Sequence, residues 1–130
     1  MYMSKERSIA LAILNKSALS FNDIIALRGY IFETGIASRE EAEMLMAVDR
    51  SPSALAPGWA AFFIEAITDF IVWQQRPTGR VTESDLDWLT GCLGDQPTAN
   101  GKALIFNIVR EAHESPSRMS EVVMRFSAAG

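Results

Sequence analysis

The feature that most constrains the fold is an apolar stretch at residues 59–75, WAAFFIEAITDFIVWQQ, the longest such run in the chain. Only Glu65, Thr68 and Asp69 interrupt it before its two final glutamines. As an α-helix it would extend about 25 Å, the width of a small domain. A helix that is apolar around most of its circumference is normally buried by other helices. The sequence therefore predicts a buried central helix over about residues 58–75.

Length and charge bound the class of protein. A chain of 130 residues suits one domain with a sizeable core, and 48% apolar with 22% charged residues is typical of a soluble globular protein. Residues 1–65 and 66–130 each hold six Lys/Arg and eight Asp/Glu, which add up to the 12 and 16 of the whole chain and its net charge of −4. Binding to nucleic acid needs a local cluster of basic residues, and none is visible. We therefore predict a single domain over residues 1–130 that binds no nucleic acid.

The compartment is inferred from cysteine usage and from two apolar runs. Cys92 is the only cysteine, so neither an intrachain disulfide nor a cysteine-based zinc site can form. The apolar run at residues 9–14 is short and lacks a clear cleavage site, so it fits an amphipathic helix better than a signal peptide. The central run is also too short for a membrane span and contains two carboxylates. We expect a cytoplasmic protein with no membrane span.

Capping residues and helical periodicity predict helices along the whole chain. Before the central helix they are expected over about residues 4–15, from Ser20 or Asn22 to Gly35, and from Ser38 to Asp49, followed by a loop at 50–58. After it they are expected at about 82–94, at 99–113, and from Pro116 onward. In the helix at 99–113 an i, i+3, i+4, i+7 set places Ile105, Ile108, Val109 and Ala112 on one apolar face. No stretch alternates with period two, so the predicted fold is an all-α bundle of about seven helices.

Two segments share the pattern T-G-x-x-[ST]-x-x-[ED]-x-[ED]-x-L without gaps, at residues 34–45 and 78–89. Each combines a helix stop at glycine, a short connection and a capped helix start. The repetition indicates two related helix–loop–helix units, although helix caps alone also produce similar patterns.

The repeated loops do not have the ligands of a calcium-binding EF-hand. Aligning the first loop glycine with the sixth position places Glu41 at the twelfth, where a glutamate is needed. The first and third positions, which need oxygen ligands, then hold Tyr30 and Phe32, and in the second copy Gln74 and Arg76. The sequence therefore excludes calcium sensing of this kind.

The two loop segments, Gly35–Glu41 and Gly79–Asp85, follow the pattern G-x-[IV]-[ST]-x-x-[ED], except that Ala37 occupies the Ile/Val position of the first. They resemble the bacterial tellurite-resistance TerB-like domains over about residues 20–115. The resemblance implies an all-α fold of around seven helices and an association with metal binding and stress-response complexes. Thr34 and Thr78 stand where the family usually has an aspartate before the loop glycine, and this departure weakens a metal site carried over from the family.

Glu65 and Asp69 are the candidate metal ligands. They stand four residues apart, so a helix places them on one face, with Arg76 further along the same stripe. One interpretation is a carboxylate pair for a hard divalent metal, completed by other groups such as Glu41 or Asp85. The other is a narrow solvated strip, or ion pairing with arginines of neighbouring helices.

Other reactive residues suggest no catalytic site. His113 is the only histidine and is predicted at a helix end as a capping or exposed residue, and Cys92 is expected to be a buried, inert thiol. The acidic group at 40–43 fits a first helical turn or a partner-facing patch. The three tryptophans and six methionines are expected in the core or on an adaptable binding surface. Motifs of serine hydrolases, phosphate-binding loops and zinc proteases are absent.

We therefore expect a non-enzymatic bacterial helical domain that acts in protein–protein interaction, with a protein partner or by self-association. The resemblance adds an expected role in stress or tellurite resistance. The alternative is a metal-binding TerB-like module that uses Glu65 and Asp69. No catalytic or cofactor-binding residue is predicted.

Overall fold

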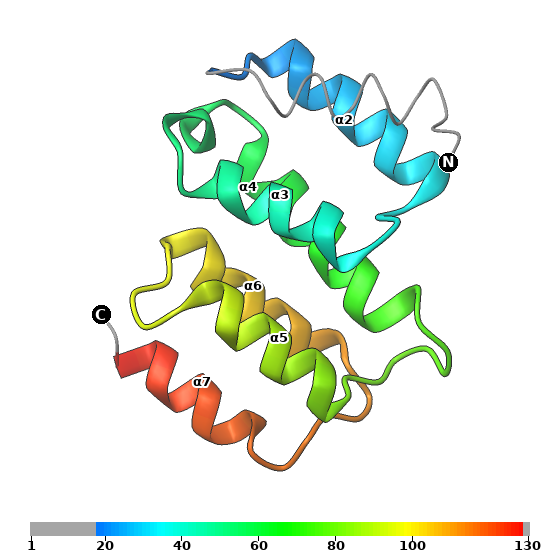
Figure 1. The fold of residues 1–130 in the computed structure, drawn as a ribbon, viewed down its shortest axis with the longest axis vertical. Coiled ribbons are helices and arrows are strands. Elements are labelled where there is room, and N and C mark those ends of the chain that lie inside the picture. Colours follow the sequence, from blue (N-terminus) through cyan, green and yellow to red (C-terminus); the bar gives the residue numbers. More distant parts are fainter. Residues whose placement is uncertain (1–17, 129–130) are drawn as a thin grey trace. The chain divides into compact units, whose positions relative to one another are not determined.

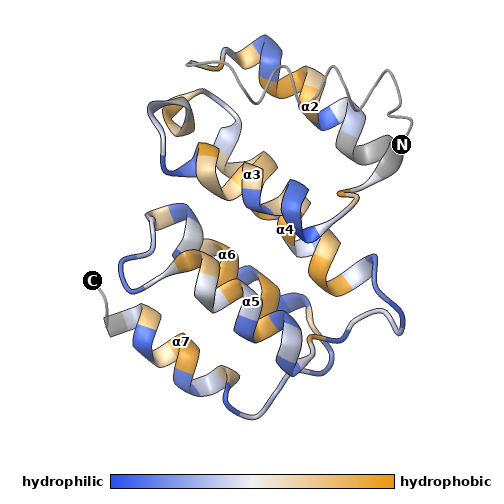
Figure 2. Ribbon diagram, in the orientation of Figure 1, coloured by the Kyte–Doolittle hydropathy of each residue, from blue (hydrophilic) through white to orange (hydrophobic). Residues whose placement is uncertain are grey.

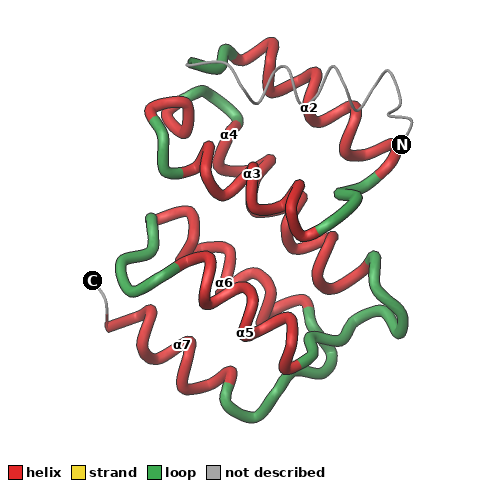
Figure 3. Tube along the Cα trace, viewed as in Figure 1, coloured by secondary structure: helices red, strands yellow, loops and turns green. Residues whose placement is uncertain are grey.

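The computed structural model describes residues 18–128, which form helices joined by loops (Figures 1 and 3). Six α-helices, one 3₁₀-helix and one π-helix occur in this part of the chain, and it contains no strand. The all-α prediction is confirmed. The helix expected at residues 4–15 lies outside the described residues, so the count of seven stays a prediction. None of the helices within 18–128 is long and apolar enough to cross a membrane.

The chain divides into two compact units, Met1–Ala66 and Ile67–Gly130. The division falls inside helix α4 (Trp59–Thr68). Apolar residues recur along the helices of both units (Figure 2), and each unit buries its own set. The prediction of a single domain over residues 1–130 stays a prediction.

The first unit contains α2 (Phe21–Thr34), α3 (Arg39–Asp49), the 3₁₀-helix η1 (Pro52–Leu55) and most of α4. Its largest buried side chain is Trp59, whose ring lies 5.8 Å from that of Phe63 at an interplanar angle of 25°. The Trp59 indole N–H donates to Asp49 Oδ1 at 2.9 Å, which satisfies both buried polar groups. Further buried apolar residues of this unit are Leu19, Ile24, Leu27, Ile36, Ala42, Leu45, Met46, Val48, Phe62 and Ala66.

Helix α2 begins with a reciprocal cap. The Ser20 backbone N–H donates to Asp23 Oδ2 at 2.9 Å, and the Asp23 N–H donates to Ser20 Oγ at 3.2 Å. The helix ends at Thr34, directly before Gly35, whose φ of +71° lies in the left-handed region. The predicted glycine stop is therefore confirmed.

The second unit contains the end of α4, the π-helix η2 (Asp69–Trp73), α5 (Glu83–Leu93), α6 (Ala99–Glu111) and α7 (Met119–Ala128). Because α4 continues into η2, the segment predicted as one α-helix over 58–75 is helical from 59 to 73 but ends in a π turn. Whether it is the central helix of the whole chain stays a prediction. The buried apolar residues of this unit include Ile67, Ile71, Val72, Leu86, Leu89, Leu93, Leu104, Ile105, Ile108, Met119, Val122 and Phe126.

The loop before α5 pairs with the loop between α6 and α7. The backbone N–H groups of His113 and Glu114 donate to Gly79 O at 2.7 and 3.1 Å, and Val81 N–H donates to Glu114 O at 2.9 Å. An isolated parallel β-bridge joins Arg80 to Glu114. Gly79 has a φ of +81°, and a Cβ there would lie 3.2 Å from His113 Nδ1. The backbone conformation therefore favours glycine, and a Cβ at this position would also press against the His113 ring.

Candidate functional site

The two predicted metal ligands lie on opposite sides of the division between the units. Glu65 Oε2 accepts a hydrogen bond from Arg28 Nη2 of α2 at 3.0 Å, in an ion pair whose side chains are 50% and 42% exposed. Asp69 is the first residue of η2 and is exposed. Residues 18–128 contain no group of three or more His, Cys, Asp or Glu side chains arranged to hold a metal ion. For Glu65, the ion pair to Arg28 agrees with the second interpretation of the sequence, ion pairing with an arginine of a neighbouring helix. The metal site stays a prediction.

The two carboxylates considered as additional ligands are buried at helix starts. Glu41 is 4% exposed, and its Oε1 accepts the backbone N–H of Ala37 at 3.1 Å. Asp85 is 3% exposed; its Oδ2 accepts the Thr82 N–H at 3.0 Å and its Oδ1 accepts Gln75 Nε2 at 3.2 Å. These bonds give both side chains a structural role at the N-termini of α3 and α5.

The three tryptophans have three different environments. Trp59 belongs to the core, and Trp88 is half-buried with its ring edge-on to Phe70 at 6.1 Å. Trp73 is 36% exposed and lies edge-on to His113, with ring centroids 5.7 Å apart. Trp59 is therefore a core residue, whereas Trp73 lies at the surface. His113 is exposed, as predicted. Cys92, which was expected to be buried, is only half-buried.

An exposed apolar face on α6 was not predicted. Phe106 is 42% exposed and Val109 is 37% exposed, whereas Leu104, Ile105 and Ile108 of the same helix are fully buried. The apolar set predicted at Ile105, Ile108, Val109 and Ala112 is therefore buried only in part. The sequence did hold a signal for this face, because Phe106 is followed by Val109 three residues later, a spacing that keeps both on one side of a helix.

A hydrogen-bond network on another side of α6 fixes this helix to the segment that ends in η2. Asn107 Nδ2 donates to Thr68 Oγ1 at 2.9 Å and to Glu111 Oε2 at 3.3 Å. The Trp73 indole N–H donates to Glu111 Oε1 at 2.8 Å. Thr68 is only 2% exposed, so the network reaches into the interior of the unit. These hydrogen bonds therefore hold in place the helix that carries the exposed Phe106 side chain.

Helix α2 has a second exposed apolar face, in the other unit. Phe21 is 54% exposed and Ile25 is 52% exposed, and Gly29 follows at the same four-residue spacing. Nothing lies within 4 Å of the position that a Gly29 Cβ would take, and its φ is not in the left-handed region. Glycine in a helix interior lowers stability by about 1 kcal/mol relative to alanine. Neither the backbone conformation of Gly29 nor the packing around it explains this choice of residue.

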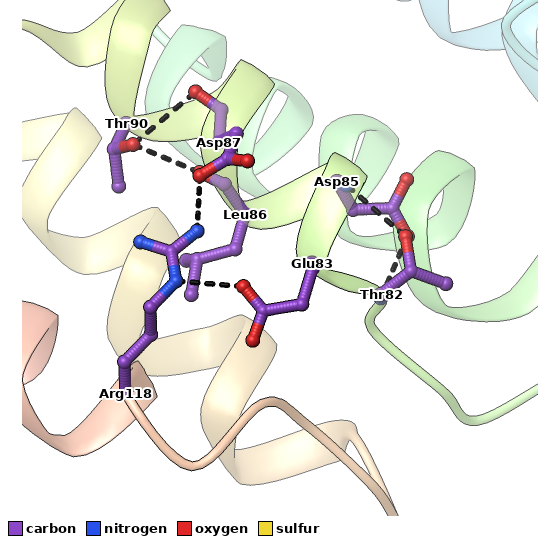
Figure 4. A network of polar contacts seen from close by, with 7 residues as sticks. All are labelled: Thr82, Glu83, Asp85, Leu86, Asp87, Thr90 and Arg118. Carbon is purple, nitrogen blue, oxygen red and sulfur yellow. Dashed lines mark hydrogen bonds and ion pairs between the residues drawn. The ribbon is translucent and has the colours of Figure 1, made fainter.

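Arg118 connects the start of α7 to α5 (Figure 4). Its Nε donates to Glu83 Oε2 at 2.7 Å, and its Nη2 donates to Asp87 Oδ1. The hydrogen bond to Glu83 and the nearby charge of Asp87 raise the pKa of Arg118 above its ordinary value. The guanidinium thus stays charged while it bridges two turns of α5.

A pocket of about 190 Å³ lies beside this bridge, between the two paired loops. Its lining is formed by residues 80–83 and 114–116. Arg80 Nε lies 3.6 Å from Glu114 Oε2, so the charged groups at the rim largely pair with each other. The pocket has the space for a small polar molecule, but the groups that line it include no histidine or cysteine to act as a base or nucleophile.

Comparisons with known proteins leave the family open. No protein-family model matches the chain, and neither the curated proteins nor the solved structures include a match. The resemblance to TerB-like domains therefore stays a prediction from the sequence, together with the stress-related role that it implies.

Proposed function

We propose that this chain is a non-enzymatic interaction module that binds another protein through exposed helix faces. The observation that carries the proposal is the pairing of large exposed apolar side chains at helical spacing. Phe21 with Ile25 on α2 and Phe106 with Val109 on α6 each form such a pair. Single exposed apolar residues are common on protein surfaces, but neighbouring ones on one helix face are typical of interaction sites.

The energetics favour α6 as a binding element. Fully burying an exposed Phe or Val side chain contributes roughly 1.5–3 kcal/mol, and the exposed 42% of Phe106 and 37% of Val109 can supply less than half of that each. Association also costs free energy when side chains and helices must first be ordered. The bonds of Asn107 to Thr68 and of Glu111 to Trp73 hold α6 in place beforehand. Less of the interaction free energy is then lost on binding.

The proposal is tested by affinity capture with the purified full chain from extracts of the source cells. We expect one protein to co-purify in stoichiometric amount with the wild type and to be lost with Phe106→Ser or with Ile25→Ser. Met124→Ser is the matched control, because Met124 is 72% exposed but has no comparable apolar neighbour on its face of α7. Equal capture by all four proteins would contradict the proposal. The molar mass of the complex, measured by light scattering on the same samples, distinguishes self-association of the chain from binding of a different protein.

Metal binding remains the alternative function, because Glu65 and Asp69 both reach solvent and an ion could approach them. Its test is a melting-temperature panel of chelator-stripped protein with Ca²⁺, Mg²⁺, Mn²⁺ and Zn²⁺. A ligand that binds only the folded state raises apparent stability, by about 2.7 kcal/mol at a hundredfold excess over its Kd. A rise that disappears in Glu65→Gln/Asp69→Asn supports the metal site. No rise with any of the four ions rules out the metal site.

As part of the proposal, we place the module in the cytoplasm and in a stress or tellurite response.

A further inference from the structure

Charged residues extend the exposed face of α6 on both sides of its apolar centre. Lys102 and Arg110 precede and follow Phe106 by four residues each. Residues four apart lie nearly above one another on a helix with a rise of about 6 Å, so the three residues form a stripe in which the backbone positions of Lys102 and Arg110 are about 12 Å apart along the helix axis. Val109 adds apolar surface beside the centre of this stripe. Lys102, Phe106, Val109 and Arg110 are called the α6 stripe below.

The two cations of the stripe, like Arg76 and Arg125, form no ion pair among residues 18–128, whereas two other arginines of the same unit do. Arg80 and Arg118 are both ion-paired with carboxylates. Within residues 18–128, by contrast, Lys102 and Arg110 form no ion pair with a carboxylate, and Arg110 donates instead to the amide oxygen of Asn107.

The acidic residue of α6 does not neutralise the stripe. Glu111 accepts from Trp73 and Asn107 and is thereby held in the bracing network. The stripe is thus locally positive in a chain whose net charge is −4.

We infer that the α6 stripe binds an acidic amphipathic helix of a partner protein. The inference rests on the proposed function and specifies its surface and partner chemistry. A helix with apolar residues between two carboxylates eight positions apart has the same 12 Å spacing as Lys102 and Arg110. Its apolar side chains cover Phe106 and Val109, while its carboxylates pair with the two cations at the rim.

Charge complementarity argues for this partner over a nucleic acid. Two cations on a chain of net charge −4 are too few to bind a phosphate backbone, which depends on several Lys/Arg contacts and counterion release. Rim charges of this kind act mainly on partner choice and association rate, and an arginine fork suits a carboxylate especially well. The choice of partner by the stripe is therefore expected to depend on the sign of the charges at positions 102 and 110.

The test uses two fluorescently labelled helical peptides and the full chain. One peptide carries repeats of Glu-x-x-x-Leu-x-x-x-Glu, and the other has Lys in place of every Glu. Fluorescence anisotropy at low salt should show at least tenfold tighter binding of the Glu peptide by the wild type. Lys102→Glu/Arg110→Glu should reverse this preference, and Phe106→Ser should weaken binding of both peptides at least tenfold.

Arg76→Glu/Arg125→Glu is the matched control, because it changes the net charge equally at two exposed positions outside the stripe. It should keep the wild-type preference, and circular dichroism should show the same helix content for every variant. The inference is overturned if the wild type binds both peptides equally or prefers the Lys peptide, or if the control variant also reverses. If capture from extracts still depends on Phe106 in that case, the interaction function survives and only the acidic partner is wrong.

Discussion

The two glycine loops, at residues 35–41 and 79–85, share a local design but differ in what surrounds them. Each has a glycine with positive φ, +71° at Gly35 and +81° at Gly79, followed by a capped helix start. Gly79, however, also accepts two backbone hydrogen bonds from the α6–α7 loop and has His113 against it. The repeated motif therefore specifies the turn itself. The surrounding packing makes the second loop, at 79–85, the place where the start of α5 is joined to the connection between α6 and α7.

The capping acids differ by one methylene, with a visible consequence. In the second loop Asp85 completes a capping box by accepting the backbone N–H of the cap residue Thr82 itself. In the first loop the longer Glu41 reaches one residue further back and accepts from Ala37 N–H instead. Both carboxylates are buried, so each helix start depends on a buried acid rather than on a solvated one.

The largest expected difference between the loops comes from adding one carbon at the glycine. A non-glycine residue in the left-handed region costs roughly 1–2 kcal/mol, which applies to both Gly35→Ala and Gly79→Ala. A Cβ at position 79 also presses against the His113 ring, so we expect Gly79→Ala to lose about 3 kcal/mol in total, more than the backbone cost alone. Urea unfolding followed by circular dichroism measures both.

Truncating His113 tests whether that extra cost is steric. His113→Ala should recover part of the stability lost in Gly79→Ala, giving a favourable coupling energy, and should not help Gly35→Ala. Equal losses in the two glycine variants, with no recovery by His113→Ala, would show that the pairing of the second loop adds nothing.

Removing the buried acids is expected to have the next largest effect. Asp85→Ala removes the acceptor of Thr82 N–H and one of the two acceptors of Gln75 Nε2, and it should cost about 2 kcal/mol. Glu41→Ala should cost somewhat less, because the bond from Ala37 N–H that it removes lies outside the cap residue Ser38. Thermal melts at neutral pH would rank the two. A larger loss for Glu41→Ala would mean that the first loop, not the second, depends more on its acid.

The cap hydroxyls are expected to be nearly equivalent. Ser38 Oγ accepts Glu41 N–H at 3.2 Å, and Thr82 Oγ1 accepts Asp85 N–H at 3.1 Å. Ser38→Ala and Thr82→Ala should each lower the free energy of unfolding by about 1 kcal/mol. Denaturant midpoints that differ clearly between them would sharpen the comparison, since the difference would then lie in the surroundings of the cap and not in its bond.

Ion pairs at the surface are expected to contribute least. Arg28→Gln, which removes the half-exposed pair with Glu65, should cost less than about 1 kcal/mol. Arg118→Gln should lower the melting temperature slightly more, because Arg118 contacts both Glu83 and Asp87. Both losses should shrink in 1 M NaCl, where charges on the surface are screened. Persistence of either loss at high salt would indicate a packing role for the arginine stem.

Features set by a few neighbouring residues were predictable from the sequence. The stop at Gly35, the caps at Ser38 and Thr82, and the buried row of Leu86 and Leu89 all depend on local chemistry and periodicity, and the structure contains them. The π turn over residues 69–73 was not predictable, because an apolar run has the same composition in an α-helix and in a π-helix.

The candidate site was harder to predict because α6 is apolar on two sides. Periodicity showed that Ile105, Ile108 and Val109 lie near one another, but the packing partners decide where the buried stripe is centred. It is centred so that Leu104 is buried and Val109 reaches solvent. For Glu65 the sequence left an ion pair open, but could not name Arg28, which is 37 residues away in the chain.

Photo-crosslinking from position 106 tests the central claim, recognition through the face of α6, most directly. A photoreactive phenylalanine analogue replaces Phe106 in the full chain, and a second preparation carries it at Glu121, an exposed position on α7. One discrete protein adduct is expected from position 106, and excess wild-type chain should abolish it, whereas excess Lys102→Glu/Arg110→Glu should not. Adducts of equal yield from both positions, or no competition by the wild type, would contradict the central claim.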